Sequence, residues 1–77
     1  MKLPLTNKQT TVLTLIRKSW VDNGYSPTRK ELSKDFEKSW KLKLSRQAID
    51  RHIYALIKKE YIIIDKKKGQ RNIKIKI

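Results

Sequence analysis

Apolar residues recur at helical spacing in three separate stretches of the chain. The first stripe consists of Val12, Leu13, Ile16 and Trp20. Thr6 and Gln9 precede it with the spacing of a capping box, in which each side chain pairs with a backbone N–H of the first turn. The pattern predicts a helix over residues 7 to about 23, with Gly24 as its left-handed C-terminal cap.

A proline-containing turn follows the first predicted helix at once. Pro27 disfavours the helical conformation for the residue before it, so residues 25–26 are expected to be extended. Thr28 and Glu31 then repeat the capping-box spacing. They predict a second, short helix that runs through about Phe36 with its apolar side chains facing inward.

Residues 37–44 leave two interpretations open. They fit a loop, or a short strand whose inward side chains would be Trp40, Leu42 and Leu44. Ser45 then caps a third helix, predicted from residue 46 to about 59. Its apolar face consists of Ile49, Ile53, Leu56 and Ile57.

The end of the chain has the alternation of a hairpin. YIIID at 61–65 and RNIKIKI at 71–77 flank the basic turn KKKGQ at 66–70, and isoleucine alternates with lysine in the last segment. Three helices followed by a hairpin predict a mainly α fold with a small β-hairpin, a winged helix-turn-helix. Residues 1–77 are expected to form a single domain of this kind. Helix-turn-helix domains bind DNA by placing one helix in the major groove, and the third predicted helix would have that position here.

The composition excludes several classes of site. Seventy-seven residues bury roughly 60% of their unfolded surface, which suffices for a small core but not for a deep catalytic cavity. The chain has no cysteine, and its one histidine, His52, has no nearby nucleophile and carboxylate. His52 is therefore interpreted as a packed helix residue. We expect no enzymatic activity, no metal, no cofactor and no membrane span or signal segment.

Charge is distributed unevenly along the chain. The net charge is +13; residues 1–40 carry eight basic and four acidic side chains, and residues 41–77 carry twelve and three. The second part, at +9, is suited to a polyanion. The alternative explanation is a lysine-rich solvated surface, as codon usage in an AT-rich genome would favour.

Several segments also resemble one known family. LTNKQTTVLTLI followed by GYSPTRKEL, then SRQAIDRHIYALIKKEYI and RNIKI, are similar to the DNA-binding domain of LexA repressors. The resemblance covers nearly the whole chain, and GYSPT is its most specific part. It implies a winged helix-turn-helix whose partner is double-stranded DNA.

The resemblance has two departures. Residues 37–44 are about five longer than the usual turn before the recognition helix, which affects the angle of that helix. LexA repressors continue into a self-cleaving serine-lysine domain that also dimerises them, whereas this sequence stops at Ile77. A chain that ends there is expected not to cleave itself, and to be a monomer in dilute solution that forms a homodimer only on DNA.

The family's base-contacting positions fall on the third predicted helix. They are Ser45, Gln47, Ala48, Asp50 and Arg51. Arg51 suits a guanine, Gln47 an adenine and Ala48 a thymine methyl, while Asp50 either accepts from a cytosine amine or orients Arg51. The alternative is that these are ordinary solvated positions of an amphipathic helix.

A second group of residues is expected to contact the DNA backbone. It consists of Thr28, Arg29, Lys30, Arg46, Tyr54, Lys58, Lys66, Lys67, Lys68 and Arg71. A plain helix cap at Thr28 and a charged hairpin tip that deters aggregation are the alternatives. Tyr25 is expected to pack between helices and Trp20 in the core. Trp40 could be a core residue, a dimer contact or a residue that stacks on DNA, and the core role is preferred.

These features predict a sequence-specific DNA-binding protein, a transcriptional repressor that acts by occupying promoter DNA in the cytoplasm, on the nucleoid. Small regulators of this kind are familiar from phages and plasmids. Two alternatives remain: a protein-binding module built on the same fold, and a replication-origin or nucleoid factor with weak sequence preference. The ratio of specific to non-specific affinity separates the last from a regulator.

Overall fold

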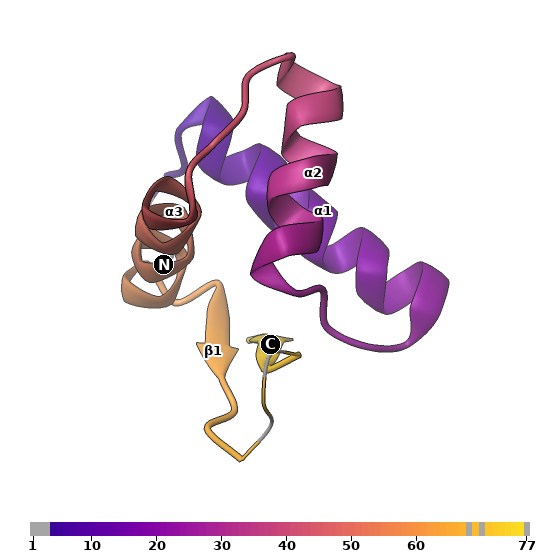
Figure 1. The fold of residues 1–77 in the computed structure, drawn as a ribbon. Coiled ribbons are helices and arrows are strands. Elements are labelled where there is room, and N and C mark those ends of the chain that lie inside the picture. Colours follow the sequence, from indigo (N-terminus) through magenta and orange to yellow (C-terminus); the bar gives the residue numbers. More distant parts are fainter. Residues whose placement is uncertain (1–3, 68, 70, 77) are drawn as a thin grey trace.

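The described part of the chain forms three helices and a two-stranded antiparallel hairpin (Figure 1). The computed structural model describes residues 4–67, 69 and 71–76. The helices are α1 (Asn7–Asn23), α2 (Arg29–Trp40) and α3 (Arg46–Lys58), and the strands are β1 (Ile62–Ile64) and β2 (Ile73–Ile75). This architecture confirms the predicted fold class, a winged helix-turn-helix.

The limits of α1 agree with the predicted ones because both ends carry local signals. The Thr6 hydroxyl accepts from the Gln9 amide, and the Gln9 side chain accepts from the Thr6 amide, each at 3.2 Å. At the other end Gly24 has a φ of 76°, and its N–H donates to the Trp20 carbonyl at 3.0 Å. This left-handed conformation costs a glycine little because it has no Cβ.

Helix α2 is longer than predicted. Its capping box at Thr28 and Glu31 is confirmed, but the helix continues four residues past Phe36 to Trp40. The strand interpretation of residues 37–44 is wrong, and the loop interpretation holds only after α2 ends. Lys41 ends the helix in the left-handed conformation, with a φ of 53°, although this lysine carries no sequence signal for a cap.

The later elements lie where they were expected, with shorter strands. Helix α3 is capped by the Ser45 hydroxyl, which accepts from the Ala48 amide at 3.2 Å. In the hairpin, Ile62 pairs with Ile75 and Ile64 with Ile73. The predicted ranges 61–65 and 71–77 overestimate both strands, and Ile77 lies outside the described residues.

One core joins all five elements. Its buried residues are Val12, Leu13, Ile16, Leu32, Phe36, Ile49, Ile53, Leu56, Ile62 and Ile73. The three helices pack against one another, β1 contacts α3, and β2 contacts α1. In Figure 1 the hairpin therefore extends from the base of the helical bundle, beside α3. The outward face of α3 and the far end of the hairpin are left exposed.

Candidate nucleic-acid interface

The outward face of α3 gathers most of the predicted base-contacting side chains. Ile49, Ile53 and Leu56 are buried on one side of the helix. A shallow hollow on the opposite side is lined by Gln47, Asp50, Arg51, Tyr54, Ala55 and Lys58. Tyr54 is 67% exposed although it is aromatic. The phenol hydroxyl of Tyr54 can donate or accept a hydrogen bond, so this exposed side chain is suited to contact with a polar partner.

Ser45 and Ala48 lie at the N-terminal end of the same helix, in a different environment. The Ser45 side chain is exposed and its hydroxyl oxygen is used as the N-cap, while Ala48 is half-buried. Capping leaves the hydroxyl hydrogen available to a further acceptor. Both predicted residues are thus close to the hollow without lining it.

The N-terminal end of α2 places Thr28, Arg29 and Lys30 next to α3. Lys30 is exposed, whereas the Arg29 side chain is mostly covered. Its guanidinium donates to the Asn72 side-chain oxygen at 2.6 Å and lies 3.8 Å from the Asp50 carboxylate. Arg29 therefore links α2, α3 and the residue before β2.

Asp50 faces Arg29 in this arrangement. The sequence left two roles open for Asp50, a cytosine contact or the orientation of Arg51. The 3.8 Å pair adds a third, which is to hold Arg29 between α2 and α3. The positive charge of Arg29 then offsets the negative charge of Asp50 on the outward face of α3.

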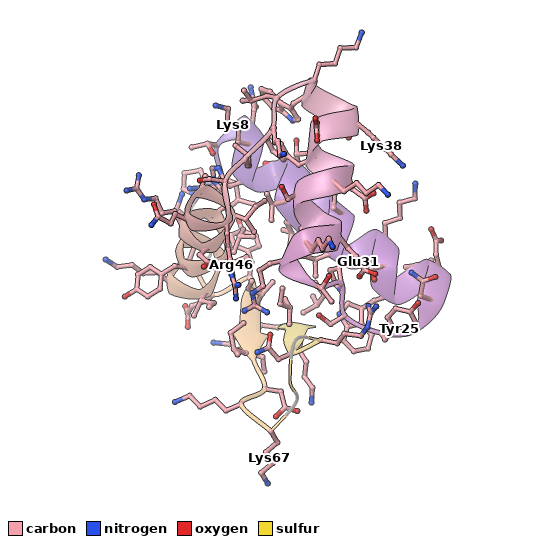
Figure 2. The ribbon with its side chains drawn as sticks, in the orientation of Figure 1. Lys8, Tyr25, Glu31, Lys38, Arg46 and Lys67 are labelled. Carbon is pink, nitrogen blue, oxygen red and sulfur yellow. The ribbon has the colours of Figure 1, made fainter. Side chains whose placement is uncertain are left out.

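A basic groove of about 980 Å³ runs between α2, α3 and the hairpin. Its cationic lining residues are Arg29, Lys30, Lys34, Lys43 and Arg46. Figure 2 labels Arg46 on the side of α3 that faces α2. Sequence reasoning missed Lys34 and Lys43. Lys34 follows Lys30 by four positions and so shares its helix face, a signal that was present in the sequence.

The far end of the hairpin carries the other predicted backbone contacts. Lys66 and Lys67 are exposed, and Figure 2 shows Lys67 pointing away from the rest of the molecule. The Lys67 amide donates to the Asp65 carboxylate at 3.0 Å, which shapes the turn. Lys68, the third predicted lysine here, lies outside the described residues.

Arg71 has an environment that the sequence did not predict. Its guanidinium donates to both carboxylate oxygens of Glu31, at 2.9 and 3.0 Å, and to the Ser26 carbonyl at 2.9 Å. It also stacks on the Tyr25 ring, 4.4 Å from the centroid. The hydrogen bonds from Arg71, with that from the Thr28 amide, lower the pKa of the Glu31 carboxyl. Tyr25 is 44% exposed and packs against Arg71, not between helices as expected.

Two other residues singled out in the sequence pack at the edge of the core. Trp40 stacks on Phe36 with centroids 5.6 Å apart, and its N–H donates to the Thr11 hydroxyl at 2.9 Å. The Trp40 side chain nevertheless remains 39% exposed. His52 stacks on Phe36 from α3 at 6.3 Å, which confirms that it is a packed helix residue.

Among residues 4–67, 69 and 71–76, no group of three or more histidine, cysteine or carboxylate side chains could hold a metal ion. No helix within those same residues is long and apolar enough to cross a bilayer.

Comparison with known families agrees with this geometry. A comparison with curated proteins found no match. The family model of the LexA DNA binding domain, however, matches residues 1–71 of the 77. That span contains the α1 and α2 capping boxes, the outward face of α3, the first strand and the turn lysines. The chain therefore belongs to the LexA DNA-binding domain family.

Proposed function

We propose that this chain binds double-stranded DNA sequence-specifically and represses transcription by occupying promoter sites. The observation that carries the proposal is the outward face of α3, where Gln47, Asp50, Arg51, Tyr54 and Lys58 surround one shallow hollow. An α-helix with its side chains is about 10–12 Å across, which matches the major groove of B-DNA at about 12 Å.

Within this proposal, base contacts come from the first half of α3. Arg51 forks onto a guanine and Gln47 pairs with an adenine, because both side chains offer two hydrogen-bonding groups on one edge. Ala48, half-buried at the helix edge, meets a thymine methyl, and the Ser45 hydroxyl donates to a neighbouring base or phosphate.

Contacts to phosphates come from both sides of α3. The groove beside α2 supplies Lys30, Lys34, Lys43 and Arg46, and Thr28 is at the N-terminal end of α2, where N–H groups favour an anion. Tyr54 and Lys58, in the second half of α3, contact the DNA backbone. Lys66 and Lys67 contact it from the hairpin. Such contacts position the protein and contribute affinity without specifying sequence.

A selection of bound sites from a random duplex pool tests the proposal. The affinity for the selected site is then compared with that for random duplexes at the same salt concentration. A regulator should prefer the selected site by about 10³-fold or more. A ratio near one would favour a nucleoid or replication-origin factor in its place.

The salt dependence of the same measurement tests the contribution of phosphates. If about five to seven phosphates are neutralised, the log–log slope of affinity against salt concentration should be about −4 to −6. Absence of duplex binding at low salt would exclude the proposal and favour a protein partner.

We further propose that the protein is a monomer in dilute solution and pairs only on DNA. Trp40 supports this, because the ring lies against Phe36 and the indole N–H is already bonded to Thr11. Sedimentation without DNA should show one protomer, and the selected site should contain inverted half-sites about one helical turn apart. A tight dimer without DNA would contradict this expectation.

A further inference from the structure

The start of strand β2, where the strand leaves the turn, is held by hydrogen bonds to the connection between α1 and α2 and to α1 itself. The Ile73 amide donates to the Ser26 hydroxyl at 3.0 Å, and Ser26 is 1% exposed. The Ile73 carbonyl accepts from the Trp20 indole at 3.0 Å. Arg71, two positions earlier, donates to the Ser26 carbonyl at 2.9 Å. Strand β2 therefore starts from a defined position against α1 and α2.

The contacts of Arg71 with Tyr25, Ser26 and Glu31 are called the Arg71 junction below. At this junction the Arg71–Glu31 pair restricts the orientation of the guanidinium as well as its position. Two parallel N–H···O bonds hold the plane of the guanidinium against the carboxylate, and the Tyr25 ring covers one face of that plane. Bidentate pairs of this kind restrict geometry more than a single contact does. Tyr25, Ser26 and Glu31, the partners of Arg71, all belong to the connection or to the first turn of α2.

The two strands that flank the hairpin lysines are short. Each strand has only three residues. An isolated two-stranded hairpin is marginally stable in water, so its orientation must come from contacts with the helices. The same first turn of α2 carries Thr28 and Lys30, so the junction connects the hairpin to another part of the proposed DNA surface.

We infer that Arg71 and Glu31 are positioning residues, which hold the hairpin so that Lys66 and Lys67 meet the DNA backbone. The inference rests on the duplex binding proposed above. It assigns Arg71 a role different from the phosphate contact that the sequence predicted. A surface held in its binding geometry before the partner arrives loses less conformational entropy on binding.

The two roles of Arg71 make opposite predictions for Glu31→Gln. If Arg71 contacts phosphate, replacement of the carboxylate by an amide weakens the hold on the guanidinium and removes a negative charge, and duplex affinity rises. If Arg71 positions the hairpin, the same substitution loosens the junction and duplex affinity falls. Glutamine retains the capping-box hydrogen bond to the Thr28 amide, so α2 is not disturbed.

Glu60→Gln is the matched control. Glu60 pairs with Lys76 at 3.0 Å, so this variant also removes one carboxylate that pairs with the C-terminal part of the chain. It leaves the Arg71 junction intact. Any change caused by net charge alone appears in both variants, and any change caused by the junction appears only in Glu31→Gln.

The experiment measures duplex affinity and its salt slope for the wild-type chain, both variants, and Lys67→Ala in the wild-type and Glu31→Gln backgrounds. Circular dichroism and thermal unfolding first establish that each variant is folded. We expect Glu31→Gln to weaken binding by about two- to fivefold, and Glu60→Gln to leave it equal or tighter. Lys67→Ala should reduce the magnitude of the slope by about one in the wild-type background and by clearly less in Glu31→Gln.

Tighter binding by Glu31→Gln, the same affinity as Glu60→Gln, or an unchanged effect of Lys67→Ala in both backgrounds would overturn the positioning role while leaving the proposed function intact. A wild-type chain that binds no duplex at low salt would overturn the proposed function, and the positioning role with it.

Discussion

The indole N–H of Trp20 donates to the Ile73 carbonyl oxygen across 53 positions of sequence, at 3.0 Å, and so joins α1 to β2. Trp20→Phe keeps an aromatic ring and removes the donor. We expect it to lower the free energy of unfolding by about 1–2 kcal/mol, because the partly buried carbonyl loses its partner. Urea denaturation measures this change.

Trp40→Phe is the control for that variant. Its indole N–H also donates to an oxygen, the Thr11 hydroxyl, but this bond is exposed and water can replace it. We expect a cost below about 1 kcal/mol. Equal costs for the two variants would show that ring size, not the bond to Ile73, determines the effect.

Gly24 and Gly69 provide a second matched pair. A Cβ at either position would meet nothing within 4 Å, but only Gly24, of the two, has a φ in the left-handed region, at 76°. Gly24→Ala should therefore destabilise the fold by about 1 kcal/mol through backbone strain alone, and Gly69→Ala by much less. Thermal unfolding of both variants measures the difference, and a larger loss at Gly69 would contradict it.

His52 should make stability depend on pH. Burial lowers its pKa below the ordinary value of 6.5, and the charge of Lys8 lowers it further. As pH falls, the unfolded chain therefore takes up this proton before the folded chain does. The contribution of His52 is fully present above pH 6.5 and is lost as pH falls through the window down to the lowered folded pKa.

Urea denaturation of the wild-type chain and His52→Gln at pH 7.5 and pH 5.5 tests this expectation. The wild-type chain should lose more stability between the two pH values than the variant, which cannot titrate at this position. Glu31 does not confuse the comparison, because its pKa is lowered from an ordinary value of 4.5 that already lies below the range. Equal losses would show that His52 is not a source of the pH dependence.

The loss of a base contact and the loss of a phosphate contact should change duplex affinity in different ways. Arg51→Ala should cost about 1–3 kcal/mol on the selected site and relax the preference at one base pair, with random duplexes bound almost as before. Alanine at both Lys66 and Lys67 should weaken all duplexes by similar factors and reduce the magnitude of the salt slope by about two. If Arg51→Ala weakens every duplex equally, Arg51 contacts phosphate and not a base.

Local signals account for what the sequence predicted well. Thr6 with Gln9 and Thr28 with Glu31 start helices through contacts three residues apart, and Gly24 ends one through its own backbone conformation. The buried face of α3, with Ile49, Ile53 and Leu56, followed from the helical spacing of its apolar residues. Each of these inferences needs only neighbouring residues.

What the sequence could not predict depends on contacts between distant residues. Helix α2 ends at Trp40 and is capped by Lys41, a lysine in a conformation for which glycine is usual. Trp40, in the added turn, stacks on Phe36. Arg71 and Glu31 are 40 positions apart, and each has the usual appearance of an exposed charge. The sequence placed Arg71 among the residues expected to contact the DNA backbone, and it gave no sign of the pair with Glu31.

Ile73 is far along the chain from Trp20 and Ser26, its hydrogen-bond partners. This separation predicts an order in which the elements fold. The helices form from neighbouring residues, but Ile73 enters the core only after a loop of dozens of residues has closed onto Ser26 and Trp20. The hairpin should then be the last element to form, and pulse-labelled hydrogen exchange should protect the Ile73 amide after the amides of α1. If the Ile73 amide is protected together with α1, assembly occurs in one step. In the expected order, the event that completes folding is also the one that brings Lys66 and Lys67 into place, so an incompletely folded chain would hold DNA with α3 alone.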